Sequence, residues 1–305
     1  MSDPASPGST RFAILIPFAI VTLVWGSTWI VIRDQIGVVP PQWSVAYRFL
    51  LAGLVMAGVA WWRGDRWPLD RRGLLFAAAM GLFQFGLNFN LVYQSERFVT
   101  SGLVSLVFAL ILVPNAVFAR IFLGQKLGTR LLVGSAVAMT GIALLFVQEA
   151  RIDPNGTERV AVGIGLAVTA VLCASIANVM QGSATARAYP MASMLATAML
   201  FSGLLDAAVA WPSVGPPVME WRTGYLVGML YLSVIASALA FTLYFRVIRA
   251  IGPAKAGYSG VIVPVIAMLL STIFEGYRWS TLAAAGGALA GLGLVIALSA
   301  RRPAR

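Results

Sequence analysis

The stretch FAILIPFAIVTLVWGSTWIVI, residues 12–32, has no charged residue and is long enough to cross the hydrocarbon core of a bilayer as a helix. Similar apolar stretches recur along the whole chain of 305 residues, separated by Pro, Gly and charged residues. The sequence is 59% hydrophobic and 11% charged, whereas soluble domains carry roughly 25% charged residues. Because so few charges cannot cover soluble domains of this size, the sequence predicts an all-α polytopic membrane protein.

We expect ten transmembrane helices, at residues 12–32, 43–62, 74–93, 101–119, 131–147, 162–182, 191–211, 224–245, 256–274 and 282–299. Short cytoplasmic loops accumulate Lys and Arg, and most of the 22 basic residues fall on the side that holds both chain termini. The opposite side has only Arg33, Arg97, Arg151, Arg159, Arg222 and Arg278. We therefore expect a protein of the inner (plasma) membrane with both termini in the cytoplasm. Arg48 lies inside the second span, and we expect its side chain to reach the outer boundary in a structural role at the helix end, with a contact to a substrate carboxylate as the alternative.

The sequence also contains a weak internal repeat. A shift of 150 residues aligns four pairs of Pro and Gly: Pro40 with Pro190, Gly53 with Gly203, Pro114 with Pro264, and Gly141 with Gly291. Because five is an odd number, two copies of a five-helix unit must cross the membrane in opposite directions. We therefore expect two inverted repeats, residues 1–150 with helices 1–5 and residues 151–305 with helices 6–10, with the substrate bound between them.

Several short motifs resemble a known family. They are WGSTW at residues 25–29, YRFLLA at 47–52, LGQKL at 123–127 and the later Gly141. These motifs resemble the EamA-type repeats of the drug/metabolite transporter superfamily, and within it the chain looks most similar to the YddG-type amino-acid exporters. The resemblance covers essentially the whole chain, and it implies ten helices and export of small metabolites, aromatic amino acids among them. The sequence departs from the family at Gln125, where a glutamate is frequent, and at residues 274–277, FEGY, a loose version of the same motif.

Polar and aromatic residues inside the spans suggest where a substrate binds. A buried polar group costs free energy unless it is paired or faces a water-filled cavity. Gln84 and Asn88 are four residues apart, so both lie on one face of their helix, where their amides suit a zwitterionic ligand. The alternative is that these amides only link helices. The residues that we expect to line a substrate cavity are Trp25, Trp29, Gln84, Asn88, Tyr93, Asn115, Tyr231, Ser237, Tyr244 and Tyr258.

Four further residues are candidates for moving parts. Pro114 and Pro264 interrupt backbone hydrogen bonding at matching positions of the two repeats, which favours a pair of hinges or gates. The alternative is that proline is simply common in membrane helices. Asn178 and Gln181 lie toward the cytoplasmic end of the sixth span, where they form an inner gate or cap the helix end.

The residues that are missing exclude several mechanisms. The chain has no His, so Ser-His catalysis, His-ligated metals and imidazole relays are excluded, and Cys173 has no partner for an intramolecular disulfide. No phosphate-binding loop is present. Asp206 is the only acidic residue in the spans, which favours facilitated export over a carboxylate proton relay.

The composition also sets the expected partners. We expect no enzyme activity, no cofactor and no metal. The expected partners are a small-molecule substrate and the lipid bilayer but not nucleic acid, because the net charge of +11 is explained by basic loops. We expect a monomer, with a dimer as the alternative. A sugar-nucleotide or phosphate-ester exchanger and a drug exporter of the same fold remain alternative functions.

Overall fold

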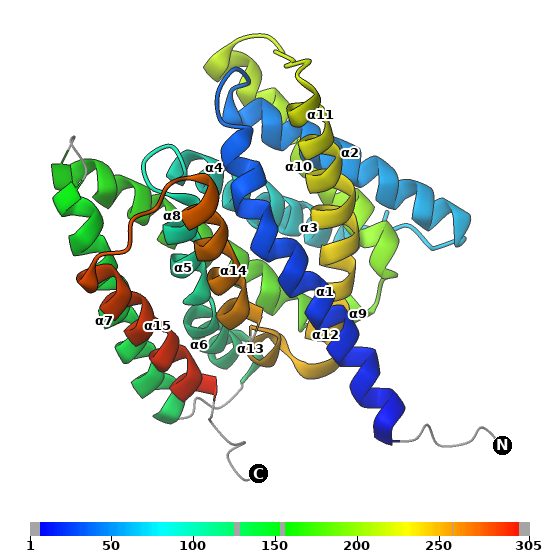
Figure 1. Ribbon diagram of the computed structural model, residues 1–305. Coiled ribbons are helices and arrows are strands. Elements are labelled where there is room, and N and C mark those ends of the chain that lie inside the picture. The colour runs from blue at the N-terminus through cyan, green and yellow to red at the C-terminus, as the bar shows by residue number, and fades with distance from the viewer. Residues whose placement is uncertain (1–6, 125–128, 153–155, 258, 299–305) are drawn as a thin grey trace.

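The computed structural model describes residues 7–124, 129–152, 156–257 and 259–298, and every regular element in these ranges is a helix (Figure 1). Within them, 7 helical stretches are long and apolar enough to cross a membrane: Ile16–Asp34, Pro41–Trp62, Arg71–Ser95, Ser101–Leu123, Thr157–Gln181, Met191–Val214 and Thr223–Ile251. Three shorter apolar helical stretches are Leu132–Leu145, Val263–Phe274 and Thr281–Gly293. The structure is therefore that of an all-helical polytopic membrane protein, as the composition predicts.

The elements follow one another in the order α1 (Pro7–Asp34), α2 (Pro41–Trp62), α3 (Arg71–Met80), η1 (Gly81–Leu87), α4 (Asn88–Ser95), α5 (Ser101–Ala109), α6 (Leu112–Leu123), α7 (Thr129–Ile152), α8 (Gly156–Gln181), α9 (Ala184–Arg187), α10 (Met191–Val214), α11 (Thr223–Leu230), η2 (Tyr231–Leu239), α12 (Ala240–Ile251), α13 (Pro253–Ala256), α14 (Ser259–Phe274) and α15 (Thr281–Leu298). In Figure 1 the first turns of α1 and the last turns of α15 both lie at the lower edge of the view.

Local sequence signals set the helix ends. The Asp70 carboxylate accepts a hydrogen bond of 3.3 Å from the amide of Gly73 and so caps α3. Pro40 is extended and Pro41 occupies the first turn of α2, where a missing N–H costs nothing. Gly124 ends α6 with a φ of 66°, a left-handed conformation that residues with a side chain rarely adopt.

Two helices contain a π-helical segment. Gly81–Leu87 (η1) lies between α3 and α4 in one continuous helix, and Tyr231–Leu239 (η2) lies in the same way between α11 and α12. The two segments begin 150 residues apart, which is the shift of the internal repeat. π-helical turns are frequent at functional sites because the extra residue re-aims the side chains around it.

The two prolines of the repeat have different effects on the backbone. The span expected at residues 101–119 is divided into α5 and α6, and the break at residues 110–111 comes one turn before Pro114. Pro114 then lies in the first turn of α6, where its missing N–H is tolerated. Pro264, in contrast, lies inside α14, which continues past it without a break. The two positions therefore do not form a symmetric pair of kinks.

Close packing between helices depends on glycines. Helices α2 and α10 lie along each other, and α7 lies along α15 at the left of Figure 1. A Cβ atom on Gly53 would lie 2.8 Å from Cγ of Leu200, and one on Gly203 would lie 2.7 Å from Cγ of Leu50. The aligned pair Gly53 and Gly203 thus makes reciprocal contacts across one interface.

In the α7–α15 pair, Gly141 makes a similar contact, since a Cβ atom there would lie 2.3 Å from the backbone nitrogen of Ala290. Its aligned partner Gly291 faces open space, and Gly293 makes the reciprocal contact instead, 2.2 Å from the backbone nitrogen of Ala138. The helices α1, α8, α12 and α14 lie between the two pairs, where α1 packs on α12 and α14 and α8 packs on α4 to α6.

Candidate functional site

A cavity of about 100 Å³ lies inside the helix bundle, with room for several water molecules. Its walls come from α1, α2, η1, α4, α5, α8, α12 and α14. The residues that line it are Trp25, Thr28, Trp29, Ile32, Arg48, Gln84, Asn88, Phe89, Val92, Ser105, Phe108, Ala109, Ile111, Ala174, Asn178, Phe241, Tyr244, Val263 and Pro264. Both halves of the chain contribute to the cavity, and most of the wall is apolar.

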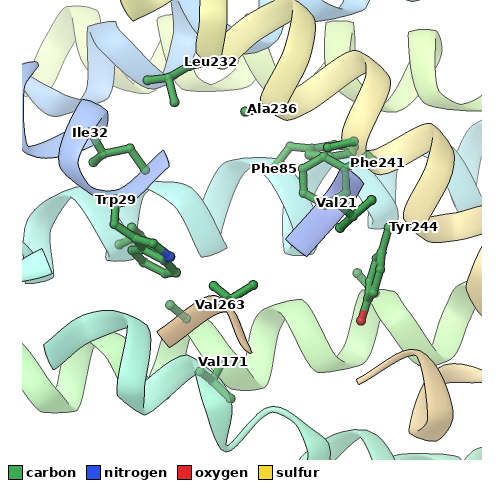
Figure 2. Close-up of a cluster of buried hydrophobic side chains, with 14 of the residues drawn as sticks. Val21, Trp29, Ile32, Phe85, Val171, Leu232, Ala236, Phe241, Tyr244 and Val263 are labelled. Atoms are coloured by element: carbon green, nitrogen blue, oxygen red, sulfur yellow. The ribbon is translucent and has the colours of Figure 1, made fainter. Parts of the chain in front are cut away.

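Aromatic rings form much of this wall. The ring of Trp25 lies 5.1 Å from that of Phe241 and 4.7 Å from that of Tyr244, in tilted and edge-on arrangements that aromatic pairs favour. Trp29 packs on Phe108 with centroids 5.2 Å apart. In Figure 2, Trp29 of α1 lies on one side of Val263 of α14, and Phe241 and Tyr244, both of α12, lie on the other. The cavity therefore suits a flat apolar or aromatic group.

The most unusual group in the cavity is the guanidinium of Arg48. Its side chain is only 1% exposed, so the expectation that it reaches the outer boundary is wrong. Nε donates a 2.9 Å hydrogen bond to Oγ of Ser237, and the guanidinium carbon lies 4.2 Å from the ring centroid of Phe89. Nη1 is buried and has no hydrogen-bond partner among the described residues. Helix packing thus holds a cation at the cavity wall with the N–H groups of Nη1 left unused.

Neutral polar groups beside Arg48 are also unsatisfied. Gln84 and Asn88 both line the cavity, and the Asn88 amide nitrogen donates to the backbone oxygen of Gln84 at 3.2 Å. The side-chain oxygens of Gln84, Asn88 and Asn178 are buried without a donor within the described chain. The indole nitrogen of Trp29 is likewise buried without an acceptor there. Buried polar atoms are nearly always hydrogen-bonded, so a polar ligand or water that reached these atoms would satisfy them.

Three other predicted lining residues, Tyr93, Tyr231 and Ser237, are not among the described residues that line the cavity. Tyr93 is fully buried and its hydroxyl donates to Oε1 of Gln35 at 2.9 Å. The hydroxyl of Tyr231 lies 2.7 Å from Oγ of Ser27. Ser237 supports the cavity indirectly, because it accepts the hydrogen bond of Arg48. Tyr258 lies outside the described residues.

The residues predicted to form gates make specific interhelical contacts. Asn178 lines the cavity, and its amide nitrogen lies 3.5 Å from Oδ1 of the buried Asn115, which joins α8 to α6. Gln181 does not line the cavity, and its Oε1 accepts hydrogen bonds from Arg249 at 3.3 and 3.4 Å. Pro264 lines the cavity and Pro114 does not.

Phe89, Phe108 and Phe241 line the cavity although the sequence does not predict it, and Arg48, for which a substrate contact is only the alternative expectation, lines it too. A signal was present for Arg48, because a charge inside an apolar span is costly and usually serves a function. No signal distinguished the three phenylalanines from those that face lipid. Among the described residues, no group of three or more acidic, His or Cys side chains is arranged to hold a metal ion.

The helices and the cavity define a class of protein: a polytopic membrane protein with a polar and aromatic cavity inside its helix bundle. This chain belongs to the EamA-like transporter family, whose pattern matches residues 12–147 and again residues 161–299. The family indicated by the sequence motifs is thereby confirmed. The names of the family and of several relatives indicate transporters, not enzymes.

Two relatives align over most of the chain. Protein PagO of Salmonella typhimurium is 27% identical over 271 residues, which cover 89% of this chain and 88% of PagO. The uncharacterized inner membrane transporter YedA of Escherichia coli K12 is 31% identical over 273 residues, which cover 86% of this chain and 84% of YedA. A solved crystal structure with 20% sequence identity has a TM-score of 0.70 and covers 94% of this chain and 96% of that chain, so it shares the fold.

Proposed function

We propose that this transporter exports small metabolites that carry a carboxylate, foremost amino acids with aromatic or apolar side chains. The observation that carries the proposal is the guanidinium of Arg48, which is buried in an aromatic cavity with Nη1 unpartnered among the described residues. A charged group of this kind is expensive to bury and costs less when an anion can occupy its free donor. No acidic residue lines the cavity to do so within the described chain.

The polar groups of the cavity match the two charges of an amino acid. A carboxylate accepts hydrogen bonds from Nη1 of Arg48 and from the indole nitrogen of Trp29. An ammonium group donates to the side-chain oxygens of Gln84, Asn88 and Asn178, which are otherwise unsatisfied. The aromatic wall then holds the apolar side chain.

The same residues argue against the alternative substrates. A phosphate ester is a dianion and is usually held by several cationic side chains, whereas Arg48 is the only basic residue among the described residues that line the cavity. A cationic drug is disfavoured by the positive charge of Arg48 and by the lack of an acidic residue among the described lining residues.

For the architecture, we propose ten spans in two inverted five-helix repeats, residues 1–150 and 151–305, with both termini in the cytoplasm. The proposal is supported by the two family matches, which fall on separate halves of the chain. It is also supported by the reciprocal contacts of Gly53 and Gly203 and by the two π-helical segments that begin 150 residues apart. The excess of Lys and Arg on the terminal side supports the orientation, and the inner membrane location follows that of YedA.

Alternating access is the proposed mechanism of transport. The cavity of about 100 Å³ is smaller than the roughly 300–1,000 Å³ of typical ligand pockets. Helices around it must therefore separate to admit an amino acid. The break before Pro114, the proline in α14 and the Asn178–Asn115 contact are the proposed hinges and gate, because each lies at or beside the cavity.

The test is uptake by purified protein in liposomes, with ligands that differ by one group. L-Tryptophan is compared with tryptamine, which lacks the carboxylate, and with indole-3-propionate, which lacks the ammonium group. A sugar phosphate and a cationic dye complete the panel. We expect uptake of tryptophan, reduced uptake of indole-3-propionate and none of tryptamine. Uptake of the dye or of the sugar phosphate in preference to tryptophan would refute the proposal.

A further inference from the structure

Glu96, at the end of α4, is a buried carboxyl group without a hydrogen-bond partner. Its side chain is 0% exposed, and neither Oε1 nor Oε2 has a donor within the described chain. Its backbone, in contrast, is well bonded, because its N–H donates to the oxygen of Val92 and its carbonyl accepts from Nη1 of Arg33. A buried carboxylate without any hydrogen bond is one of the costliest groups in a protein, whereas the neutral acid is much less so.

A second carboxyl group lies near Glu96. Glu275, just after α14, is 9% exposed in its side chain and accepts a 2.6 Å hydrogen bond from Oγ of Ser101. Nε of Arg33 lies 3.7 Å from Oε1 of Glu275. The negative charge of Glu275 opposes ionisation of Glu96.

Charged groups on α1 and α2, and Glu275 just after α14, act on Glu96. Burial raises the pKa of Glu96 well above its usual range, and the charge of Glu275 adds to this effect. The positive charges of Arg33 and Arg48 act in the opposite direction. The hydroxyl of Tyr93 also lies within electrostatic range. On the side of α8, Arg159 donates to the backbone oxygen of the neighbouring residue 97 and not to Glu96.

Arg48 links this carboxyl group to the cavity. Arg48 lines the cavity, its Nη1 is buried without a hydrogen-bond partner among the described residues, and its charge favours the ionised form of Glu96. An anion bound at Arg48 neutralises that charge. Neutralisation removes one of the two positive charges that oppose protonation of Glu96.

We propose that Glu96 is a proton-binding site linked to Arg48, so that neutralising the guanidinium by a bound carboxylate promotes protonation of Glu96. The ligand part of this inference rests on the proposed function. A proton is taken up from water when the carboxylate binds and is released when the carboxylate leaves. Substrate and proton then move in the same direction, and an inward proton gradient slows export instead of driving it. The sequence places Glu96 in a loop, so no feature of the apolar spans predicts this site.

Infrared difference spectroscopy of the purified full-length protein tests the site directly, because a protonated carboxyl group has its own C=O band. Between acid and alkaline pH, we expect a titrating band that Glu96→Gln removes and that Glu158→Gln, at an exposed carboxyl group, leaves in place. Arg48→Gln should raise the midpoint of the band by about 1 pH unit. Arg48→Lys, which keeps the charge, and Arg246→Gln, at an exposed arginine, should not. Glu275→Gln should lower the midpoint.

The effect of a bound carboxylate is tested with L-tryptophan. It should raise the midpoint of the Glu96-dependent band in wild type, as Arg48→Gln does, whereas tryptophan amide, which has no carboxylate, should not. Absence of a band that depends on Glu96, or a midpoint that Arg48→Gln leaves unchanged, overturns the inference. If Arg48→Gln does not fold, the effects of Glu275→Gln and tryptophan decide in its place. A band that responds to Arg48→Gln in a protein that binds no tryptophan supports the linked proton site and refutes the proposed substrate instead.

Discussion

The contact between α7 and α15 gives a sharp prediction about stability, because it contains two glycines in opposite environments. A Cβ atom on Gly141 would lie 2.3 Å from the backbone nitrogen of Ala290 and 2.5 Å from the backbone oxygen of Gly286, whereas one on Gly291 would have no atom within 4 Å. Ordinary contacts begin at 3.4 Å. Alanine at position 141 therefore requires the two backbones to separate by about 1 Å, while alanine at position 291 requires no movement.

The magnitude follows from two opposing terms. Alanine in place of glycine inside a helix stabilises by roughly 0.5–1 kcal/mol, and this gain is common to both variants. Overpacking a close interface costs typically about 1–3 kcal/mol, and only Gly141→Ala incurs this cost. We therefore expect Gly141→Ala to be less stable than Gly291→Ala by about 1–3 kcal/mol, with Gly291→Ala equal to or above wild type.

Thermal unfolding of the purified protein in one detergent measures this difference. A change of 1 kcal/mol shifts Tm by about 2–4 °C in a chain of similar length, so the two variants should be separated clearly. Equal Tm values for the two variants, or a higher value for Gly141→Ala, would refute the close approach of α7 and α15.

Two further predictions concern buried and capping carboxylates. Asp206 accepts hydrogen bonds from Nδ2 of Asn90 at 2.9 Å and from Oγ of Ser202 at 3.1 Å, so Asp206→Leu should destabilise by about 1–3 kcal/mol. The double variant Asp206→Leu/Asn90→Leu should have a higher Tm than Asp206→Leu alone. An equal Tm would contradict the pairing of Asp206 with Asn90. The hydroxyl of Tyr189 donates to Asp70 at 2.7 Å and lowers the pKa of that carboxyl group below 3.8. The stability that this bond contributes is present above pH 3.8 and is lost as the pH falls through the lowered pKa of Asp70. Tyr189→Phe should therefore make Tm fall less steeply between about pH 5 and pH 3. An unchanged slope of Tm against pH would contradict the effect of this bond on Asp70.

The fold could be predicted largely from composition and hydropathy. A stretch without charges that is long enough to span a bilayer has few alternatives to a helix, because lipid cannot satisfy backbone polar groups. The break before Pro114 was harder to place, because proline is tolerated both inside a membrane helix and in its first turn. The π-helical segments left no trace in the sequence, since only the hydrogen-bond register of the folded helices defines them.

The cavity could be predicted only in part. Gln84 and Asn88 were found because two amides four residues apart in a span share a helix face. Tyr93 and Asn115 are equally polar, but each has a partner outside its own helix, and such a partner cannot be read from one segment. For Arg48, side-chain length allows both a path to the outer boundary and a path into the bundle. The side chain points into the bundle because it contacts Ser237, which is distant in sequence, and Phe89, which lies on another helix.

The central claim is that Arg48 binds the carboxylate of the substrate, and a cycle of two variants and two ligands tests it most directly. Binding of L-tryptophan and of tryptophan amide is measured for wild type, Arg48→Gln and Arg246→Gln. A charge-assisted hydrogen bond contributes roughly 1.5–3 kcal/mol, so Arg48→Gln should weaken tryptophan about 10- to 100-fold and leave the amide nearly unchanged. Arg246→Gln should change neither. An equal loss for both ligands, or no loss for tryptophan, would contradict the account.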